Sequence, residues 1–174
     1  MLFRSSEHSS WSKPIVHSPD DWERILARPA NFQNDYWQMI EKLMRVAIEA
    51  SQNQFIVGMT DLHGSYDILA ALRDPQDLCM DVLDCPETLR RAGRHAADIF
   101  VQSFERSWEM VRGANHGSTC WTPFYHQGPA YVPSCDFWCM VSPTVARELI
   151  WPDVEHEIRS RSEEHTSELQ SQFR

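Results

Sequence analysis

The chain has 174 residues, 42% of them hydrophobic and 24% charged, a composition typical of one globular domain of ordinary size. Sixteen basic residues stand against 25 acidic ones, and the net charge is −9. This balance argues against nucleic acid or an anionic membrane as a partner, because phosphate binding needs clustered Lys and Arg. No apolar run reaches the ~18 residues of a membrane span, and no secretory signal opens the chain. We expect a cytoplasmic protein whose five cysteines are reduced thiols.

The N-terminal third predicts two helices and one strand. Residues 1–31 are polar and irregular, apart from a short helix over Trp22–Ala27. From Asn34, a good helix N-cap, apolar residues recur at three- and four-residue steps and predict a helix with one buried face. Gln54–Met59 is a short apolar, β-branched run that we interpret as a buried strand. It leads into the polar turn Thr60–Asp67.

Three helices follow in the middle of the chain. A short one is predicted over Ile68–Arg73, and the next begins at Pro75, since proline after an aspartate fits the first turn of a helix. The third begins at Pro86 and is the clearest element of the sequence, with a long apolar stripe. We expect Gly113 to end it as the C′ residue.

The C-terminal part completes the predicted fold. Tyr131–Met140 reads as a second strand, and Ser142 followed by Pro143 opens a last helix. Strands separated by helices are typical of parallel β/α units, and a complete β/α barrel needs about 250 residues. The predicted fold class is therefore α/β, an incomplete and helix-rich TIM-type (β/α) barrel fragment over residues 32–160, after the irregular segment 1–31.

Polar side chains follow the first predicted strand, at the end where parallel α/β folds place their sites. Asp61 is a candidate anchor, acid or base, and His63 a candidate proton shuttle. Gly64 would let the backbone approach a ligand, and Tyr66 and Asp67 are candidate substrate-binding residues. A structural interpretation competes with this one, since Asp67 is also a good cap for the next helix and Asp61 can close an Asx turn.

A second candidate group lies at the end of the second predicted strand. Asp136 stands between apolar residues, and a carboxylate there is costly to bury unless it has a partner. Asp136 is therefore a candidate catalytic residue, or else it bonds to loop backbone. Trp138 is a candidate for lining a pocket, or it packs in the core.

Two further groups of residues are candidate binding sites, but each also has an ordinary structural explanation. Arg90, Arg91 and Arg94 could hold an anion, but such a run is usually a solvated helix face. Soft metal ligands recur at His116, Cys120, Cys135 and Cys139. Their spacing is looser than that of structural zinc sites, and free cysteines often pack as small hydrophobes. We predict no metal site.

Two segments carry a family resemblance. GMTDLHGSYDILAALRDPQDLCMDVLDCPETLRRA (58–92) and SCDFWCMVSPTVARELIWPDV (134–154) resemble the uroporphyrinogen decarboxylase (URO-D) superfamily in order and spacing. The first resembles that family's strand, turn, helix and D-x-PE helix start, and the second its F-D-S-W-like strand end followed by S-P and a helix. The similarity covers about Phe55–Val154 and implies the middle of a single-domain β/α barrel.

The resemblance implies a tetrapyrrole-related enzyme. Classical members decarboxylate the acetate side chains of uroporphyrinogen without a cofactor. By this resemblance the full-length parent enzyme would be a carboxy-lyase, with Asp61 or Asp136 as general acid or base, aided by His63. Gly64–Ile68 falls on the family's P-F-T-L-like turn, although Ser65 replaces the proline. One alternative is a zinc- and corrinoid-dependent methyltransferase, whose partner would be a corrinoid protein. Another is a non-catalytic binding module. The implied partner is a tetrapyrrole or other small molecule, and the full-length parent could be a homodimer.

The last residues differ from the rest. Arg161–Ser171 reads RSEEHTSELQS, has no hydrophobic period, and resembles the in-frame translation of a sequencing-library adapter. We therefore expect residues 161–174 to be foreign to the fold. We also expect the chain to be part of a larger enzyme and to be inactive by itself.

Overall fold

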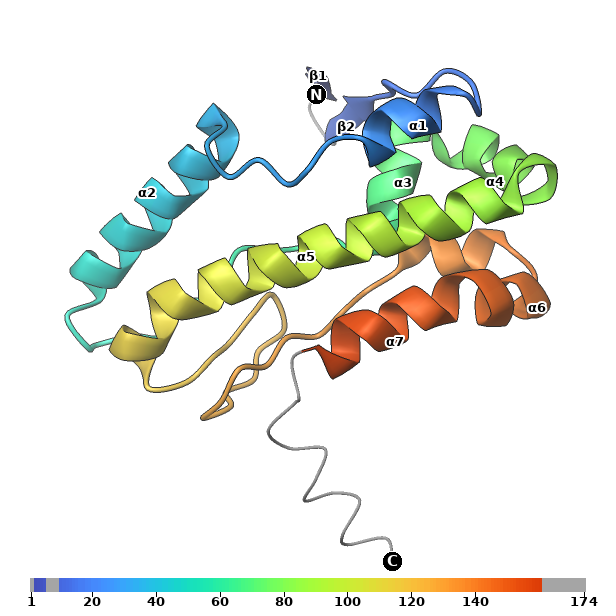
Figure 1. Cartoon of the computed structure of the whole chain (residues 1–174). Coiled ribbons are helices and arrows are strands. Elements are labelled where there is room, and N and C mark those ends of the chain that lie inside the picture. The colour runs from blue at the N-terminus through green and yellow to red at the C-terminus, as the bar shows by residue number, and fades with distance from the viewer. Residues whose placement is uncertain (1, 6–9, 161–174) are drawn as a thin grey trace, which may run out of the picture. The chain divides into compact units, whose positions relative to one another are not determined.

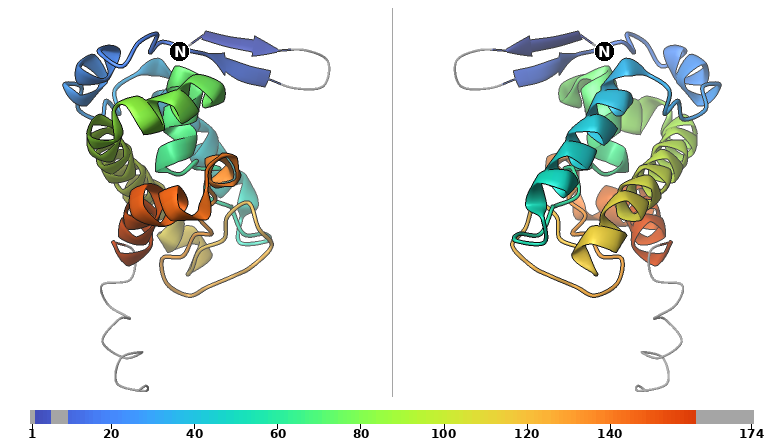
Figure 2. Two further views of the ribbon diagram at one scale, coloured as in Figure 1. Left: turned by 90° about the vertical axis from the view of Figure 1, so that its right-hand side faces the viewer. Right: turned by 90° about the vertical axis from the view of Figure 1, so that its left-hand side faces the viewer.

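The computed structural model describes residues 2–5 and 10–160, so the predicted foreign tail at 161–174 lies outside the described residues. Helices dominate the described part (Figure 1). Its strands form one N-terminal hairpin, in which β1 (Leu2–Ser5) pairs antiparallel with β2 (Ser10–Lys13) (Figure 2). The prediction of an α/β fold, an incomplete TIM-type barrel fragment, is therefore wrong, because the described residues contain no parallel strand pair.

Helices arise where the sequence predicts them, with ends shifted by a few residues, and one further helix replaces part of a predicted strand. They are α1 (Asp21–Leu26), α2 (Asp35–Ser51), α3 (Ser65–Arg73), α4 (Pro75–Asp84), α5 (Pro86–Asn115), the 3₁₀ helix η1 (Asp136–Met140), α6 (Pro143–Val145), the π turn η2 (Ala146–Ile150) and α7 (Trp151–Arg159).

Side-chain caps fix three of the helix starts. Asn34 Oδ1 accepts the backbone N–H of Trp37 at 2.9 Å at the start of α2. The carboxylate of Asp74 accepts an N–H at the start of α4, and the hydroxyl of Ser142 does so at the start of α6. Each bond satisfies a backbone donor that has no partner within its own helix. The predicted starts at these residues are confirmed.

The strand predicted over Gln54–Met59 is wrong, and the segment is irregular. Asn115, the last residue of α5, donates from Nδ2 to the carbonyl of Val57 at 2.8 Å and accepts the Val57 N–H at 3.1 Å. The side-chain amide of Asn115 thus satisfies both backbone groups of Val57, as a neighbouring strand would. Phe55 and Ile56 are exposed. A short apolar run therefore does not by itself specify a buried strand.

The strand predicted over Tyr131–Met140 is also wrong. Its second half forms the 3₁₀ helix η1, and the residues before it form a loop. A strand needs a neighbour to satisfy its backbone groups, and the segment at Gln54–Met59 provides none. The backbone N–H groups at the start of η1 instead donate hydrogen bonds to the side-chain carboxylate of Asp67.

Helix α5 continues past the stop predicted at Gly113. Gly113 has no positive φ, and the left-handed residue after the helix is His116, with φ 53°. The C′ position is therefore filled by a histidine, although glycine is the usual residue there.

The chain forms two compact units, each with its own core. Helix α5 passes from unit 1 into unit 2 between Ile99 and Phe100. Of the described residues, those within 2–29, 63–99 and 134–156 belong to unit 1, and those within 30–62, 100–133 and 157–160 belong to unit 2.

Large apolar side chains fill both cores. That of unit 1 is made by α1, α3, α4, α5, η1 and the π turn, and includes Trp22, Tyr66, Leu69, Leu78, Leu89 and Ile150. In unit 2, the rings of Phe100 and Phe104 meet Tyr131 edge to face, with centroids 5.8 and 6.2 Å apart. Met44 from α2 and Met59 join this cluster.

Candidate functional site

The residues of the first predicted group divide between the two units. Asp61 belongs to unit 2, where its exposed carboxylate accepts the hydroxyl of Tyr131 at 3.1 Å. His63 belongs to unit 1 and is exposed. Gly64, which follows it, is buried and occupies the N-cap position of α3.

Tyr66 is a core residue of unit 1. Its side chain has no exposed surface, and its ring stacks on Phe137 with centroids 6.3 Å apart. The hydroxyl donates to the carbonyl of Leu149, in the π turn, at 3.1 Å, and burial raises the pKa of this phenol. The geometry therefore supports a packing role for Tyr66 and gives no support to the predicted contact with substrate.

Asp67 joins the two predicted groups. Its Oδ1 accepts the N–H of Phe137 at 2.9 Å, and its Oδ2 accepts the N–H of Asp136 at 3.0 Å. The carboxylate thus caps η1, 69 residues further along the chain, and not α3, which begins at Ser65. The first turn of α3 and the segment around Asp136 therefore meet within unit 1.

Two tryptophans form an exposed aromatic pair in the same unit. Trp138 of η1 and Trp151 of α7 are 37% and 43% exposed, and their rings meet edge to face with centroids 6.1 Å apart. Asp136, two residues before Trp138, is also exposed. Aromatic surface and a carboxylate are therefore both accessible along η1.

The basic residues of α5 line a shallow groove of about 450 Å³ in unit 1. Its lining side chains are Glu87, Arg90, Arg91, Arg94, His95 and Asp98. Arg91 pairs with Glu23 of α1, and Arg94 Nε lies 3.1 Å from the carboxylate of Asp153 in α7. Because carboxylates already balance these guanidinium groups, the contacts favour an ion-paired helix face over a site for a free anion.

Arg90 also donates a hydrogen bond to a backbone carbonyl of the π turn. Pro152 has no N–H to donate to the carbonyl of Glu148, four residues earlier. Arg90 Nη1 donates to that carbonyl at 2.6 Å. Together with the Tyr66 bond to Leu149, this contact ties the π turn to α3 and α5.

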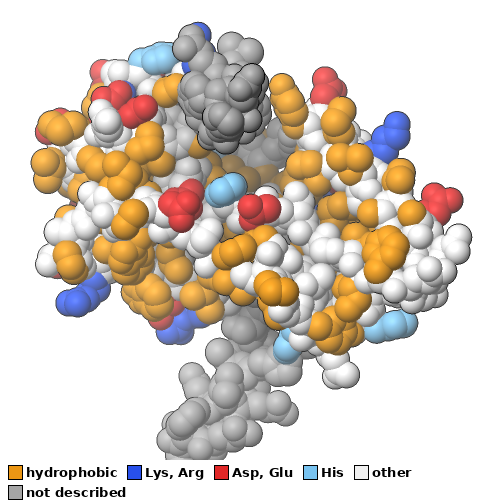
Figure 3. All heavy atoms as spheres, turned by 180° about the vertical axis from the view of Figure 1, so that it is seen from behind, with side chains coloured by type: hydrophobic (Ala, Val, Ile, Leu, Met, Phe, Trp, Pro, Cys, Tyr) orange, Lys and Arg blue, Asp and Glu red, His pale blue; other side chains and the backbone are white. Residues whose placement is uncertain are grey.

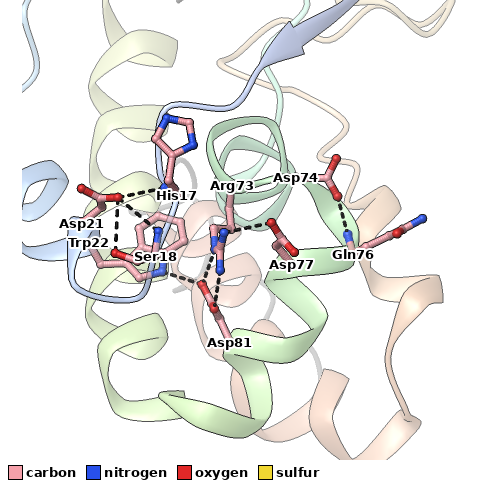
Figure 4. A network of polar contacts seen from close by, with 9 residues as sticks. All are labelled: His17, Ser18, Asp21, Trp22, Arg73, Asp74, Gln76, Asp77 and Asp81. Atoms are coloured by element: carbon pink, nitrogen blue, oxygen red, sulfur yellow. Dashed lines mark hydrogen bonds and ion pairs between the residues drawn. The ribbon is translucent and has the colours of Figure 1, made fainter.

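A buried ion pair in unit 1 was not predicted from the sequence (Figure 4). Arg73 at the end of α3 makes two bonds to Asp81 of α4, at 2.9 and 3.2 Å, and a third to Asp77 at 2.9 Å. The indole N–H of Trp22 donates to Asp81 at 2.9 Å. Every charged end in this network has a partner, which suits a structural role. Its only sequence signal is the spacing of Arg73, Asp77 and Asp81 at four-residue steps.

Asp153 is a second buried carboxylate that the sequence patterns did not single out. Its exposed fraction is 3%. Burial raises its pKa to about 6, although the positive charges of Arg94 and His156 act in the opposite direction. Its carboxylate faces the N-terminal third of α5, where Gly93 leaves room for it.

Residues 2–5 and 10–160 contain no group of three or more His, Cys, Asp or Glu side chains that could hold a metal ion. Of the four soft ligands considered from the sequence, His116 and Cys120 lie in unit 2, and Cys135 and Cys139 in unit 1.

Comparisons with known proteins add no relative. No family model, no curated protein and no solved structure matches the chain. Among the described helices, none is long and apolar enough to cross a bilayer.

Proposed function

We propose that the segments around His63–Asp67 and Asp136–Trp138 form a binding site for a tetrapyrrole in a URO-D-like enzyme. The observation that carries the proposal is the pair of hydrogen bonds that the Asp67 carboxylate accepts from the backbone N–H groups at the start of η1. These bonds join the two segments on which the family resemblance rests. The proposal concerns the site alone and does not include a barrel.

The exposed groups suit different parts of such a ligand. The rings of Trp138 and Trp151 offer apolar surface for a planar macrocycle, since aromatic groups favour stacked or edge-to-face contacts. The carboxylate of Asp136 is an acceptor for pyrrole N–H groups. Decarboxylation replaces a carboxylate with a proton, and we propose His63, whose side chain is exposed, as the proton donor, since imidazole commonly acts as a general acid.

We also propose a reducing compartment, the cytosol, as the location of the protein. All five cysteines are free thiols, and disulfide-free cysteines are typical of reducing compartments.

Titration with uroporphyrin III tests the binding proposal. We expect the Soret band to shift on binding, and Trp138→Ala to weaken the affinity about 3- to 10-fold through the loss of one aromatic contact. Trp121→Ala is the matched control, because Trp121 is also exposed but belongs to unit 2. An unchanged Soret band at every concentration would refute the proposed site.

Turnover of uroporphyrinogen is a separate measurement. The number of carboxyl groups lost can be counted by chromatography of the oxidised products. If the chain is active, His63→Ala should abolish turnover and leave uroporphyrin affinity unchanged. A His63→Ala variant with full turnover would remove His63 from the proposed mechanism.

A further inference from the structure

Helix α2 carries two apolar stripes that face different surroundings. The inner stripe is buried or half-buried and consists of Trp37, Ile40, Met44, Ile48 and Ser51. Ile40, Met44 and Ile48 pack in the core of unit 2. The outer stripe consists of Tyr36, Met39, Leu43, Val46 and Ala50. At 3.6 residues per turn, the two stripes lie about 120° apart around the helix axis.

The outer stripe is unusually exposed for its composition. Tyr36 is 66% exposed, Met39 and Leu43 are each 63% exposed, and Val46 is 55% exposed. Single exposed apolar residues need no explanation, but a continuous row of four on one helix marks an interaction surface. Hydrophobic side chains are abundant on the face of the molecule drawn in Figure 3.

The spacing of the outer stripe indicates what covers it. Its members are three, four, three and four residues apart, which is the a/d repeat of a helix that packs along another helix. A flat surface or a small ligand would not require this repeat. The fitting occupant is therefore a second helix with the same repeat.

The charges beside the stripe point to a second copy of α2. Lys42 and Glu49, both exposed, follow one edge of the stripe at the g positions of the repeat. In an antiparallel pair with Leu43 opposite Val46 of the second copy, Lys42 lies beside Glu49 of that copy, and the symmetry repeats the pair. The same register sets Met39 opposite Ala50. Shifting it by one heptad, so that Tyr36 meets Val46, would instead place like charges together.

We propose that the protein self-associates through the outer stripe of α2, as an antiparallel helix pair held in register by Lys42 and Glu49. This inference is independent of the proposed tetrapyrrole site, which lies in unit 1. Because α2 has only 17 residues, the pair spans about two heptads and roughly 25 Å. Stable interfaces bury about 1,600 Å² in total, so a contact of this length predicts a dimer that dissociates on dilution.

Sedimentation equilibrium of the full chain over a range of concentrations tests the proposal. We expect the apparent mass to rise from that of a monomer toward twice that value. Leu43→Glu should keep the protein monomeric at concentrations where the unchanged chain is dimeric, because it places a charge in the seam. Arg45→Ala is the matched control on the polar face of the same helix, where Arg45 pairs with Glu41, and it should leave association unchanged.

Charge reversal tests the direction and the partner together. Lys42→Glu should weaken the dimer at least 10-fold by placing two carboxylates side by side, and the double variant Lys42→Glu/Glu49→Lys should restore it. In a parallel pair, or with an unrelated partner helix, the double variant would not restore association. The proposal would be overturned if the protein were monomeric at all concentrations, or if Lys42→Glu did not change the dissociation constant of the dimer. Circular dichroism of each variant checks that α2 remains folded.

Discussion

At the scale of single residues, Asp67 shows how a cap can be recognised while its target is missed. Aspartate near a helix start is a common N-cap, and the local pattern predicted this role for the helix that follows. In the structure, the carboxylate caps η1 instead, through two backbone N–H groups that lie 69 and 70 residues away. The bond type follows from the residue, but the partner depends on the tertiary fold.

Replacing Asp67 with asparagine tests this cap. Asparagine keeps the shape but offers only one, uncharged, acceptor oxygen, so one of the two N–H groups loses its acceptor and the other loses its charge-assisted bond. We expect the free energy of unfolding in urea to fall by about 1–2 kcal/mol. Asp136→Asn is the matched control, because it removes the same charge from an exposed neighbour and should change stability by less than about 0.5 kcal/mol. Equal effects of the two substitutions would contradict the capping role.

Asp153 makes stability depend on pH in a defined direction. Its pKa is raised from 3.8 to about 6 in the folded chain, so the folded state binds more protons than the unfolded state between those values. The free energy of unfolding should therefore fall as pH rises from about 4 to 6, with the full cost present above 6.

The size of this effect can be measured by difference. Two pKa units correspond to an order of 2–3 kcal/mol, and Asp153→Asn should flatten the profile by about that amount between pH 4 and 6. Denaturant titrations of both proteins at several pH values give the comparison. Parallel profiles would mean that Asp153 titrates at its ordinary pKa.

At the scale of elements, replacing glycine with alanine is expected to change stability in opposite directions at the two glycine positions of α5. Helix propensity alone favours alanine over glycine by roughly 1 kcal/mol at both positions. A Cβ on Gly93 would lie 2.8 Å from Cε2 of Tyr66 and would also collide with the carboxylate of Asp153. A Cβ on Gly113 would meet nothing within 4 Å.

We expect Gly93→Ala to lower the thermal midpoint and the free energy of unfolding by about 1–3 kcal/mol, the usual cost of overpacking. Gly113→Ala should raise stability by about 0.5–1 kcal/mol, since only the backbone term applies. Stabilisation by both substitutions would show that α3 and α7 do not approach α5 as closely as the structure has them.

The elements also show which local signals were sufficient. Asn34, Asp74 and Ser142 each marked a helix start correctly, because a cap bonds to residues two or three positions away and the sequence contains both partners. The segment at Val57 failed because its backbone partner is Asn115, 58 residues later. No periodicity within the segment reports whether such a partner is a strand or a side chain.

For the candidate site, local motifs were again the source of the predictions. The exposed residues Asp136, Trp138 and His63 were identified from their place in two short motifs. The burial of Tyr66, which gives no support to its predicted contact with substrate, could not be predicted, because it depends on α3 packing against η1 and the π turn. The pair of Arg73 and Asp81 was missed because charges at four-residue steps usually lie on a solvated face.

At the scale of the whole molecule, each of the two units has its own apolar core, and this arrangement predicts local unfolding. Phe104 lies in the core of unit 2 and Leu69 in that of unit 1, both almost fully buried. Phe104→Ala removes about 3–5 kcal/mol of packing. We expect it to speed amide hydrogen exchange in α2 more than in α3 and α4.

Leu69→Ala is the matched variant and should have the reverse pattern, with faster exchange in α3 and α4. Mass spectrometry of peptides from each unit provides the measurement. If either substitution accelerates exchange equally in all these helices, the two cores unfold as one cooperative system.

The five free thiols have a practical consequence. Cys79, Cys85, Cys120 and Cys135 are partly buried, and Cys139 alone is exposed. Cys139 lies next to Trp138 on η1, with its sulfur 2.9 Å from the carbonyl of Asp136. A fluorophore with a maleimide group should attach there first, without any engineered cysteine. The unaltered protein thus carries its own attachment point for an optical reporter, one residue from the tryptophan that we propose as a ligand contact.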